Sequence, residues 1–206
     1  MSQSVIFASL SVFLYCIGFI PYIYHVFHGR VVPHPFSWTI WLISALGNAY
    51  ILYDLSGWTW SLWSLSMRCI ALTIGMICGW IYIKKIQISF FDYLALFAVG
   101  LIIIGMYFLS PKVTVIAMVI LDAIILLPTV KKIWIDPRTE DSLIWFTVAL
   151  SQACLLVSLP FYTFENSFFW IYSIIASLSV GIFRWIRWYV FHAPWYERIT
   201  DFCFKK

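Results

Sequence analysis

Two ionisable side chains lie inside stretches that are otherwise almost entirely apolar. Asp122 occurs in the run TVIAMVILDAIILLPTVKKIW, and Arg68 occurs in GWTWSLWSLSMRCIALT. A carboxylate or guanidinium in the middle of a membrane costs about 2.5–3.5 kcal/mol on insertion scales, so such groups are usually paired, protonated or in contact with water. Both residues are about ten positions from one end of their segment and would lie at similar depth. We expect Asp122 and Arg68 to interact, and the alternative is that each pairs separately with nearby polar groups.

Three further residues could contact a polar solute, two at membrane depth and one at a cytoplasmic helix end. Asn48 and Gln152 carry amides that could hydrogen-bond to a solute, although bonds between helices, worth about 0.6 kcal/mol each, are the alternative. Trp145 could stack on a ring-shaped solute, and the alternative is an anchor at the membrane interface. The sequence therefore predicts a polar site inside an apolar bundle.

Other kinds of site are not indicated by the sequence. His25 and His28 share a helix face, but no carboxylate or cysteine joins them at the spacing of a metal site, so we expect no bound metal and no cofactor. No phosphate-binding loop and no nucleophile–base arrangement is present, so we do not expect an enzyme. The net charge of +4 comes without a run of basic residues, which argues against nucleic-acid binding.

Composition places the chain in a membrane. Of its 206 residues 63% are hydrophobic and only 11% are charged, whereas soluble domains carry roughly 25% charged residues. A transmembrane helix needs about 20 predominantly apolar residues, and seven such segments are predicted at about 5–27, 36–53, 58–83, 92–110, 112–130, 142–162 and 166–188. We expect an all-α integral membrane protein with seven transmembrane helices and the bilayer as its main partner.

The basic residues predict its orientation. Alternate loops and the C-terminal tail hold eleven Lys and Arg residues, and the opposite side holds only Lys112. Because positive charge stays on the cytoplasmic side, the N-terminus is expected outside and the C-terminus in the cytoplasm. The tail at 184–206 mixes aromatic and basic residues and is expected to continue the last helix and then lie along the inner headgroups, and the alternative is a plain anchor with no further role. The short loops suit a multi-pass protein of a bacterial inner membrane.

Two prolines mark a possible internal repeat. Shifting the sequence by 107 residues brings Pro21 onto Pro128 and Trp38 onto Trp145, and a short basic loop follows each proline. Three helices, one linking helix and three more helices give a 3+1+3 plan, with residues 1–87 as the first repeat, 88–111 as the linker and 112–206 as the second repeat. Since one helix intervenes, the two repeats would be parallel.

Both proline segments, FIPYIYHVFHGRVVPHPFS and LLPTVKKIWIDPRTEDS, resemble the PQ-loop motif of the SWEET sugar transporters and their relatives. Tyr22 and Thr129 stand where that motif has glutamine. The resemblance implies a SWEET-like bundle that moves a solute by alternating access, with Pro21 and Pro128 as hinges. It also implies a solute site on the third helix of each repeat. Those helices carry the following polar residues here: Arg68 in the first, and Tyr172, Ser173 and Ser177 in the second.

The leading hypothesis is therefore a transporter of a small polar solute, with Asp122 as a candidate proton carrier. The alternative is a receptor or accessory protein whose SWEET-like bundle binds a peptide or lipid without moving it. Gly75 and Gly79 form a GxxxG motif that would allow close packing of helices, either inside the first repeat or in a homo-oligomer.

Overall fold

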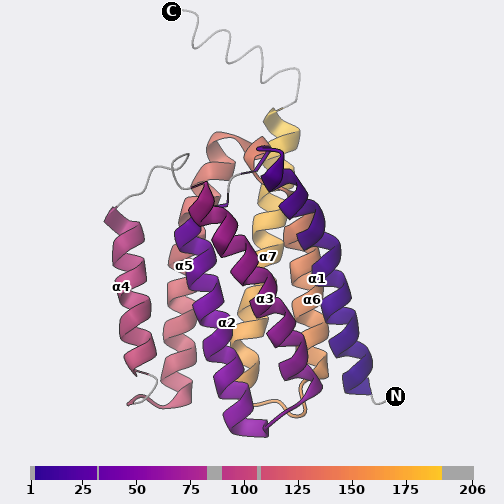
Figure 1. Ribbon diagram of the computed structural model, residues 1–206, viewed down its shortest axis with the longest axis vertical. Coiled ribbons are helices and arrows are strands. Elements are labelled where there is room, and N and C mark those ends of the chain that lie inside the picture. Colours follow the sequence, from indigo (N-terminus) through magenta and orange to yellow (C-terminus); the bar gives the residue numbers. More distant parts are fainter. Residues whose placement is uncertain (1–2, 32, 83–89, 106–107, 192–206) are drawn as a thin grey trace, which may run out of the picture.

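The chain forms an all-helical bundle. The computed structural model describes residues 3–31, 33–82, 90–105 and 108–191, and all statements about structure refer to these residues. They contain no strand, and they form the following helices (Figure 1): α1 (Gln3–Phe27), α2 (Pro35–Ser56), α3 (Trp60–Ile81), α4 (Phe90–Gly105), α5 (Pro111–Ile135), the 3₁₀ helix η2 (Pro137–Thr139), α6 (Ser142–Ser158) and α7 (Phe164–Phe191). The tail after residue 191, expected along the headgroups, lies outside the described residues.

Local signals in the sequence set several helix boundaries. The Thr59 side chain accepts a hydrogen bond from the Leu62 amide at 3.2 Å and caps α3, and the Asp141 carboxylate caps α6 through the Leu143 amide at 2.9 Å. Proline occupies the first position of α2 and of α5, where its missing N–H is not needed. Helix α6 ends at Ser158, whereas the sequence predicted an end near residue 162. The helix stops earlier because a residue that precedes a proline, here Pro160, disfavours helical geometry.

Four of the helices are long and apolar enough to cross a membrane, namely Gln3–Phe27, Trp60–Ile81, Pro111–Ile135 and Phe164–Val190. Large apolar side chains cover the outside of the bundle: Phe13, Phe97 and Leu127 are each more than 60% exposed. Such an apolar outer surface is unusual for a soluble monomer and suits contact with lipid. The expectation of an all-α membrane protein is therefore supported by the fold.

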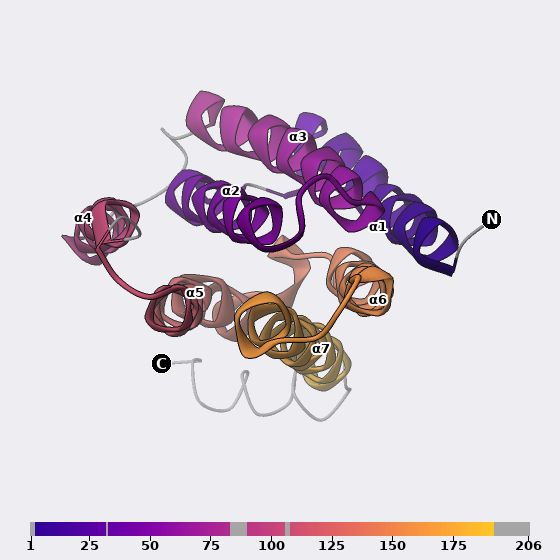
Figure 2. The same ribbon diagram turned by 90° about the horizontal axis from the view of Figure 1, so that it is seen from below.

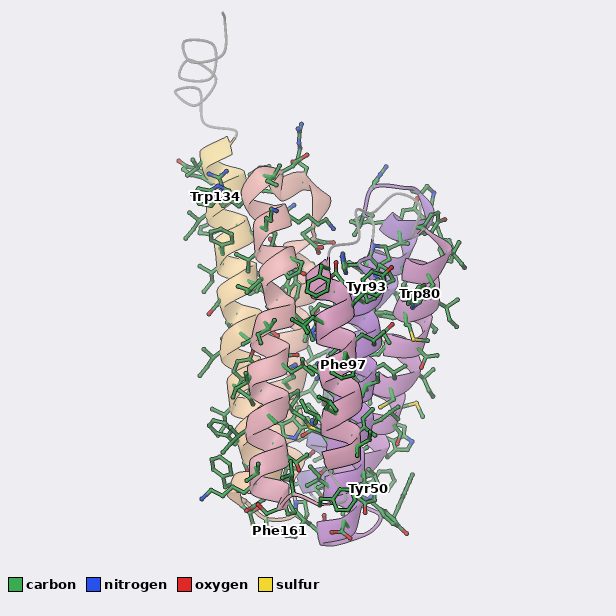
Figure 3. All side chains as sticks on the ribbon, turned by 90° about the vertical axis from the view of Figure 1, so that its left-hand side faces the viewer. Tyr50, Trp80, Tyr93, Phe97, Trp134 and Phe161 are labelled. Atoms are coloured by element: carbon green, nitrogen blue, oxygen red, sulfur yellow. The ribbon has the colours of Figure 1, made fainter. Side chains whose placement is uncertain are left out.

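Aromatic side chains lie at both ends of the bundle. Figure 3 shows Tyr50 and Phe161 near one end, and Trp80, Tyr93 and Trp134 near the other. All five are exposed on the outer surface. Tyrosine and tryptophan are enriched where a membrane protein meets the headgroups, so these two belts are consistent with helices that run from one interface to the other.

The helices form two groups of three, with the same order in each. Helix α3 packs against both α1 and α2, and α7 packs against both α5 and α6. Between the groups, α1 packs against α6 and α2 packs against α5 (Figure 2). Helix α4 lies outside both groups, against α5 and α2. We call α1–α3 the first triplet and α5–α7 the second triplet.

Small residues allow the closest approach between the triplets. A β-carbon on Gly18 of α1 would overlap the Thr147 hydroxyl of α6. One turn or more away along the same seam, Ser151 Oγ of α6 donates to the Ser11 carbonyl of α1 at 2.8 Å, and the two hydroxyls are 3.1 Å apart. Small residues at this seam bring the two backbones together, as in other packed membrane helices.

Candidate functional site

A central cavity of about 100 Å³ lies between the two triplets. A buried water needs roughly 10–15 Å³ of such space, so there is room for on the order of seven to ten waters or one small solute. Every α-helix except α4 contributes to the wall, which has an aromatic part, a polar part and a charged part. The residues discussed below are among the following lining residues: Tyr15, Tyr22, His34, Trp38, Trp41, Ser44, Arg68, Asp122, Pro128, Lys132, Glu140, Trp145, Gln152, Trp170, Ser173 and Ser177.

Arg68 and Asp122 both line this cavity, from opposite triplets. Asp122 is only 6% exposed, and the Arg68 charge acts on it electrostatically. The two side chains are nevertheless not in ion-pair contact, because none of the ion pairs among the described residues joins them. The predicted interaction therefore exists as an attraction across the cavity and not as a closed salt bridge.

The guanidinium of Arg68 is held by aromatic rings. Its central carbon lies 5.4 Å from the ring centroid of Tyr15 and 5.6 Å from that of Trp170, both within the range of cation–π attraction. Its Nη1 atom is buried and has no hydrogen-bond partner. Arg68 also borders a second cavity of about 30 Å³ on the side of Ser11 and Ser151. A buried donor without a partner is costly, so an acceptor is expected here when the site is occupied.

A polar strip from the second triplet forms another part of the wall. Gln152 of α6 is 1% exposed, and its Nε2 donates to Ser173 Oγ of α7 at 2.7 Å. The Ser177 hydroxyl donates to Gln152 Oε1 at 3.5 Å, which is a weak bond. These three predicted site residues therefore come together, and the structure holds the amide in place through two hydroxyls one helical turn apart.

Tryptophan rings form the aromatic part of the wall. Trp41 makes edge-to-face contacts with Trp38 at 5.7 Å and with Trp145 at 5.9 Å between ring centroids. Trp38 also contacts Tyr22 at 5.4 Å. The indole Nε1 of Trp145 is buried without a hydrogen-bond partner. Trp145 therefore lies on the cavity and not among the outer aromatic residues, which is compatible with a role in solute contact.

Two residues predicted for the site do not line the cavity. The Asn48 amide donates to the Ser44 carbonyl at 2.8 Å and contacts Met118 Sδ at 3.7 Å, so its bonds link α2 to itself and to α5. Tyr172 lies behind the wall, and its buried hydroxyl is directed at the Asp122 carboxylate, so it is a neutral donor beside that acid. Both are close to the site, but neither forms part of the wall around the enclosed space.

The residues that line the cavity stop short of the end of the bundle where α3 and α7 begin, which we call the far end. Ser61 Oγ of α3 donates to the Ser158 carbonyl of α6 at 2.7 Å, and Ser158 Oγ donates to Ser61 Oγ at 3.0 Å. Both serines are almost completely buried. Hydroxyl pairs thus join the triplets beyond the inner end of the cavity, a contact that the sequence analysis missed.

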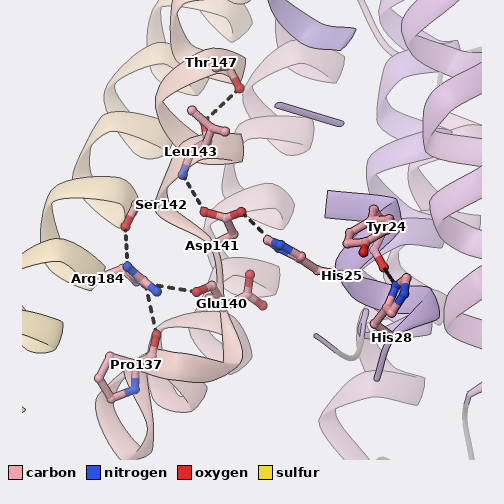
Figure 4. A network of polar contacts seen from close by, with 10 residues as sticks. All are labelled: Tyr24, His25, His28, Pro137, Glu140, Asp141, Ser142, Leu143, Thr147 and Arg184. Carbon is pink, nitrogen blue, oxygen red and sulfur yellow. Dashed lines mark hydrogen bonds and ion pairs between the residues drawn. The ribbon is translucent and has the colours of Figure 1, made fainter. Parts of the chain in front are cut away.

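The opposite end, which holds Lys132 and Arg184 and which we call the basic end, is polar. Lys132 Nζ lies 2.8 Å from Glu140 Oε1, and both line the mouth of the cavity. His25 Nδ1 of α1 lies 3.4 Å from Asp141 Oδ2 at the start of α6, which links the two triplets (Figure 4). Arg184 of α7 donates to the Pro137 and Glu140 carbonyls at 3.0 Å and to Ser142 Oγ at 3.2 Å.

His34 adds a titratable group at this mouth. Its Nε2 lies 3.6 Å from Asp92 Oδ1 of α4. Burial lowers the pKa of His34 below its ordinary value, Lys132 adds to that effect, and the Asp92 carboxylate opposes it less strongly. His34 is therefore neutral at pH 7 in the folded chain.

His25 and His28 do not converge on a metal site. His28 Nδ1 donates to the Tyr24 carbonyl of its own helix at 2.8 Å, while His25 faces Asp141 (Figure 4). Among the residues that the structure describes, no three His, Cys, Asp or Glu side chains are grouped as metal ligands would be.

Both predicted hinge prolines lie inside continuous helices. Pro21 is in α1 and Pro128 is in α5, which runs past it through Lys131 and Lys132 to Ile135, five residues beyond the predicted end. Pro128 is part of the cavity wall. Because proline removes the bond to the carbonyl four residues earlier, it leaves the Ile124 carbonyl without its usual partner and makes local bending cheaper.

Gly75 and Gly79 face α2 of the same chain. A β-carbon on Gly75 would overlap the Trp38 ring, and one on Gly79 would lie 2.9 Å from the Pro35 backbone. Their close packing is therefore intramolecular, within the first triplet. Homo-oligomerisation stays a prediction, and it would need another surface.

Comparison of the chain with models of protein families, with curated proteins and with solved structures found no match.

Proposed function

We propose that the chain is a multi-pass membrane transporter that moves a small polar solute by alternating access. The observation that carries the proposal is the cavity between the two triplets, which is lined by an acid and a base that form no ion pair and is separated from the far end by the Ser61–Ser158 contact. Charged groups inside a membrane protein usually face a water-filled path and mark the route of a solute or proton. In this view the cavity opens toward the basic end.

The arrangement of helices supports a relation between the triplets. A two-fold axis along the membrane normal would exchange α1 with α5, α2 with α6 and α3 with α7. It would then exchange the α1–α6 contact with the α5–α2 contact, and both contacts exist. This is the geometry expected of two parallel repeats with α4 as the linker. We therefore propose seven spans in a 3+1+3 plan of the PQ-loop type, with the N-terminus outside and the basic end in the cytoplasm of a bacterium.

The hinge proposal assigns the rocking motion to Pro21 and Pro128. Opening the far end requires the hydroxyl pairs between the triplets to break while the basic end closes. Each such bond contributes on the order of 0.6 kcal/mol, so thermal energy and solute binding are sufficient to exchange them. Asp122 is the proposed proton carrier if transport is coupled to protons.

A receptor that binds without transporting is the second candidate. The extensive α1–α6 interface favours a receptor, because Gly18 and Thr147 pack so closely that the triplets cannot move relative to each other at that point. A chain that cannot rock there would hold a ligand without releasing it on the other side.

Purified protein in sealed liposomes distinguishes the two candidates. Uptake is measured for a panel of labelled sugars, nucleosides, vitamins and amino acids, with protein-free liposomes as the control. The transporter proposal expects saturable uptake of at least one compound. Thermal stabilisation by a compound that shows no uptake would support the receptor, and it would contradict transport of that compound.

A further inference from the structure

Two charges in the cavity wall have no direct ionic partner, which distinguishes them from the other charged groups there. Lys132 and Glu140 already pair with each other at 2.8 Å near the basic end. Arg68 and Asp122 share the inner part of the cavity without ion-pair contact. In the part of the chain that the structure describes, Asp122 has only neutral donors beside it, from Tyr172 and Trp41, and Arg68 has only aromatic rings and an unpartnered Nη1. Because hydrogen bonds between two charged groups are stronger than those to neutral ones, each group still favours a partner of opposite charge.

Because the two wall charges are opposite in sign and lie on different helices, the ligand that satisfies both carries one negative and one positive group. Arg68 comes from α3 of the first triplet and Asp122 from α5 of the second, so a solute that contacts both would bridge the triplets. The unpartnered Nη1 of Arg68 seeks an acceptor, and a carboxylate is the acceptor that binds a guanidinium most strongly. The Asp122 carboxylate only accepts hydrogen bonds, and an ammonium group is its strongest donor.

The rest of the wall selects for a flat apolar group. Trp38, Trp41 and Trp145 line the same cavity and contact one another through Trp41, which lies beside Asp122. Aromatic rings favour other rings in offset or edge-to-face contact by about 0.5–1.5 kcal/mol beyond the area they bury. A dry cavity of about 150 Å³ holds one benzene molecule, so the space of about 100 Å³ takes one aromatic solute only if part of that solute extends into the mouth at the basic end.

We propose that the cavity binds a small zwitterion with an aromatic side chain, its carboxylate at Arg68 and its ammonium group at Asp122. The inference rests on the proposed function, because it takes the cavity to be a solute site. It deepens that function by replacing a general polar solute with one of zero net charge and two opposite charges. Binding of such a solute pulls the triplets together at the cavity, which is how it would bias the closed state on the basic side.

Matched ligands test the charge pattern directly. Binding of four ligands to the full chain in detergent is measured by calorimetry. The first is L-phenylalanine, and glucose is the uncharged comparison. The other two are 2-phenylethylamine, which lacks the carboxylate, and 3-phenylpropanoate, which lacks the ammonium group. The proposal expects phenylalanine to bind about 10- to 100-fold more tightly than either singly charged analogue, because each loses one charge-assisted contact. Equal binding of all three aromatic ligands, or tighter binding of glucose, overturns it.

Two variants assign the charges to residues. In Arg68→Gln the preference for phenylalanine over 2-phenylethylamine should disappear, and in Asp122→Asn the preference over 3-phenylpropanoate should disappear. Arg30→Gln and Asp54→Asn, which change exposed residues, should retain both preferences. If either cavity variant fails to fold, Arg68→Lys and Asp122→Glu keep the charge and should keep the preference, and the four-ligand comparison on the unmodified chain decides independently.

The same data separate this inference from the proposed function. Binding of phenylalanine with the expected pattern, but without uptake into liposomes, supports the zwitterion site and contradicts transport. Uptake of neutral solutes by a chain that does not bind phenylalanine supports transport and contradicts the zwitterion site.

Discussion

Gly75 of α3 lies against the indole ring of Trp38 of α2, with no room for a β-carbon between them. The ring cannot easily retreat, because Phe19, Tyr22 and Trp41 contact it from other sides. The same tryptophan lines the cavity. The close approach of α3 to α2 therefore fixes the position of an aromatic group in the candidate site.

Gly75→Ala should destabilise the chain. Overpacking of a well-packed interior typically costs about 1–3 kcal/mol in free energy of unfolding, and the added methyl group would push Trp38 into the cavity. Thermal unfolding in detergent measures the effect. The matched control is Gly100→Ala in α4, where a β-carbon meets nothing within 4 Å and alanine should stabilise the helix by about 0.5–1 kcal/mol. Equal midpoints for both variants would contradict the packing argument.

His34 should make stability depend on pH in the acidic range. Because its pKa is lowered in the folded chain from an ordinary 6.5, the unfolded chain binds more protons as the pH falls below about 6.5. The contribution of His34 is therefore fully present above that pH and is lost progressively below it. Between pH 7.5 and pH 5.5 the thermal unfolding midpoint of the His34→Gln variant should fall less than that of the unmodified chain. Identical losses would mean that His34 does not carry the effect.

Arg184 should stabilise the loop between α5 and α6. Arg184→Gln removes its three hydrogen bonds to Pro137, Glu140 and Ser142. Since hydrogen bonds to charged groups contribute about 1.5–3 kcal/mol and this side chain is partly exposed, we expect a loss of about 1–3 kcal/mol in unfolding by denaturant. Arg138→Gln is the control, because its pair with Asp136 is exposed and should contribute about 0–1 kcal/mol. A loss no larger than that of the control would refute the role.

Pro128→Ala should reduce transport without reducing the stability of the fold. Proline inside a helix costs about 3 kcal/mol or more relative to a good helix former, so alanine should leave the thermal midpoint unchanged or raise it. If bending at Pro128 is part of the transport cycle, uptake by liposomes should fall severalfold. Pro111→Ala, at the first position of α5, should affect neither. Normal uptake by Pro128→Ala would show that the proline is a static kink.

Much of the architecture could be predicted from the sequence because the signals for it are local. Apolar runs of about 20 residues and their Pro and Gly breaks gave helix ends within a few residues in α1, α2, α3 and α7. The end of α5 was predicted too early, since Lys131 and Lys132 resemble loop residues although the helix continues through them. Long lysine side chains can reach the interface from a helix, so their charge does not require a break.

The candidate site could be predicted only in part. Asp122 and Arg68 are conspicuous because a charge is rare in an apolar segment, and both do line the cavity. The serines that close the far end gave no signal, because serine is common in membrane helices and Ser61 and Ser158 are 97 residues apart. The role of Gly75 and Gly79 was equally open in the sequence, since GxxxG allows close packing without identifying the helix that approaches.

The most direct test of the central claim is whether the cavity can be reached from both sides of the membrane. All five native cysteines are replaced by alanine and a single cysteine is placed at Ser173 in the cavity wall. Its reaction with a membrane-impermeant thiol reagent is then measured from each side of sealed vesicles. A further pair, Ser61→Cys with Ser158→Cys, can be cross-linked across the far end before labelling, since the native hydroxyls are 3.0 Å apart.

Alternating access predicts reaction from both sides without the cross-link, and reaction only from the basic end once the far end is cross-linked. Reduction of the cross-link should restore reaction from the far end. If the cysteine at position 173 reacts from one side alone in the uncross-linked chain, the cavity is a one-sided binding site and the transport account is wrong.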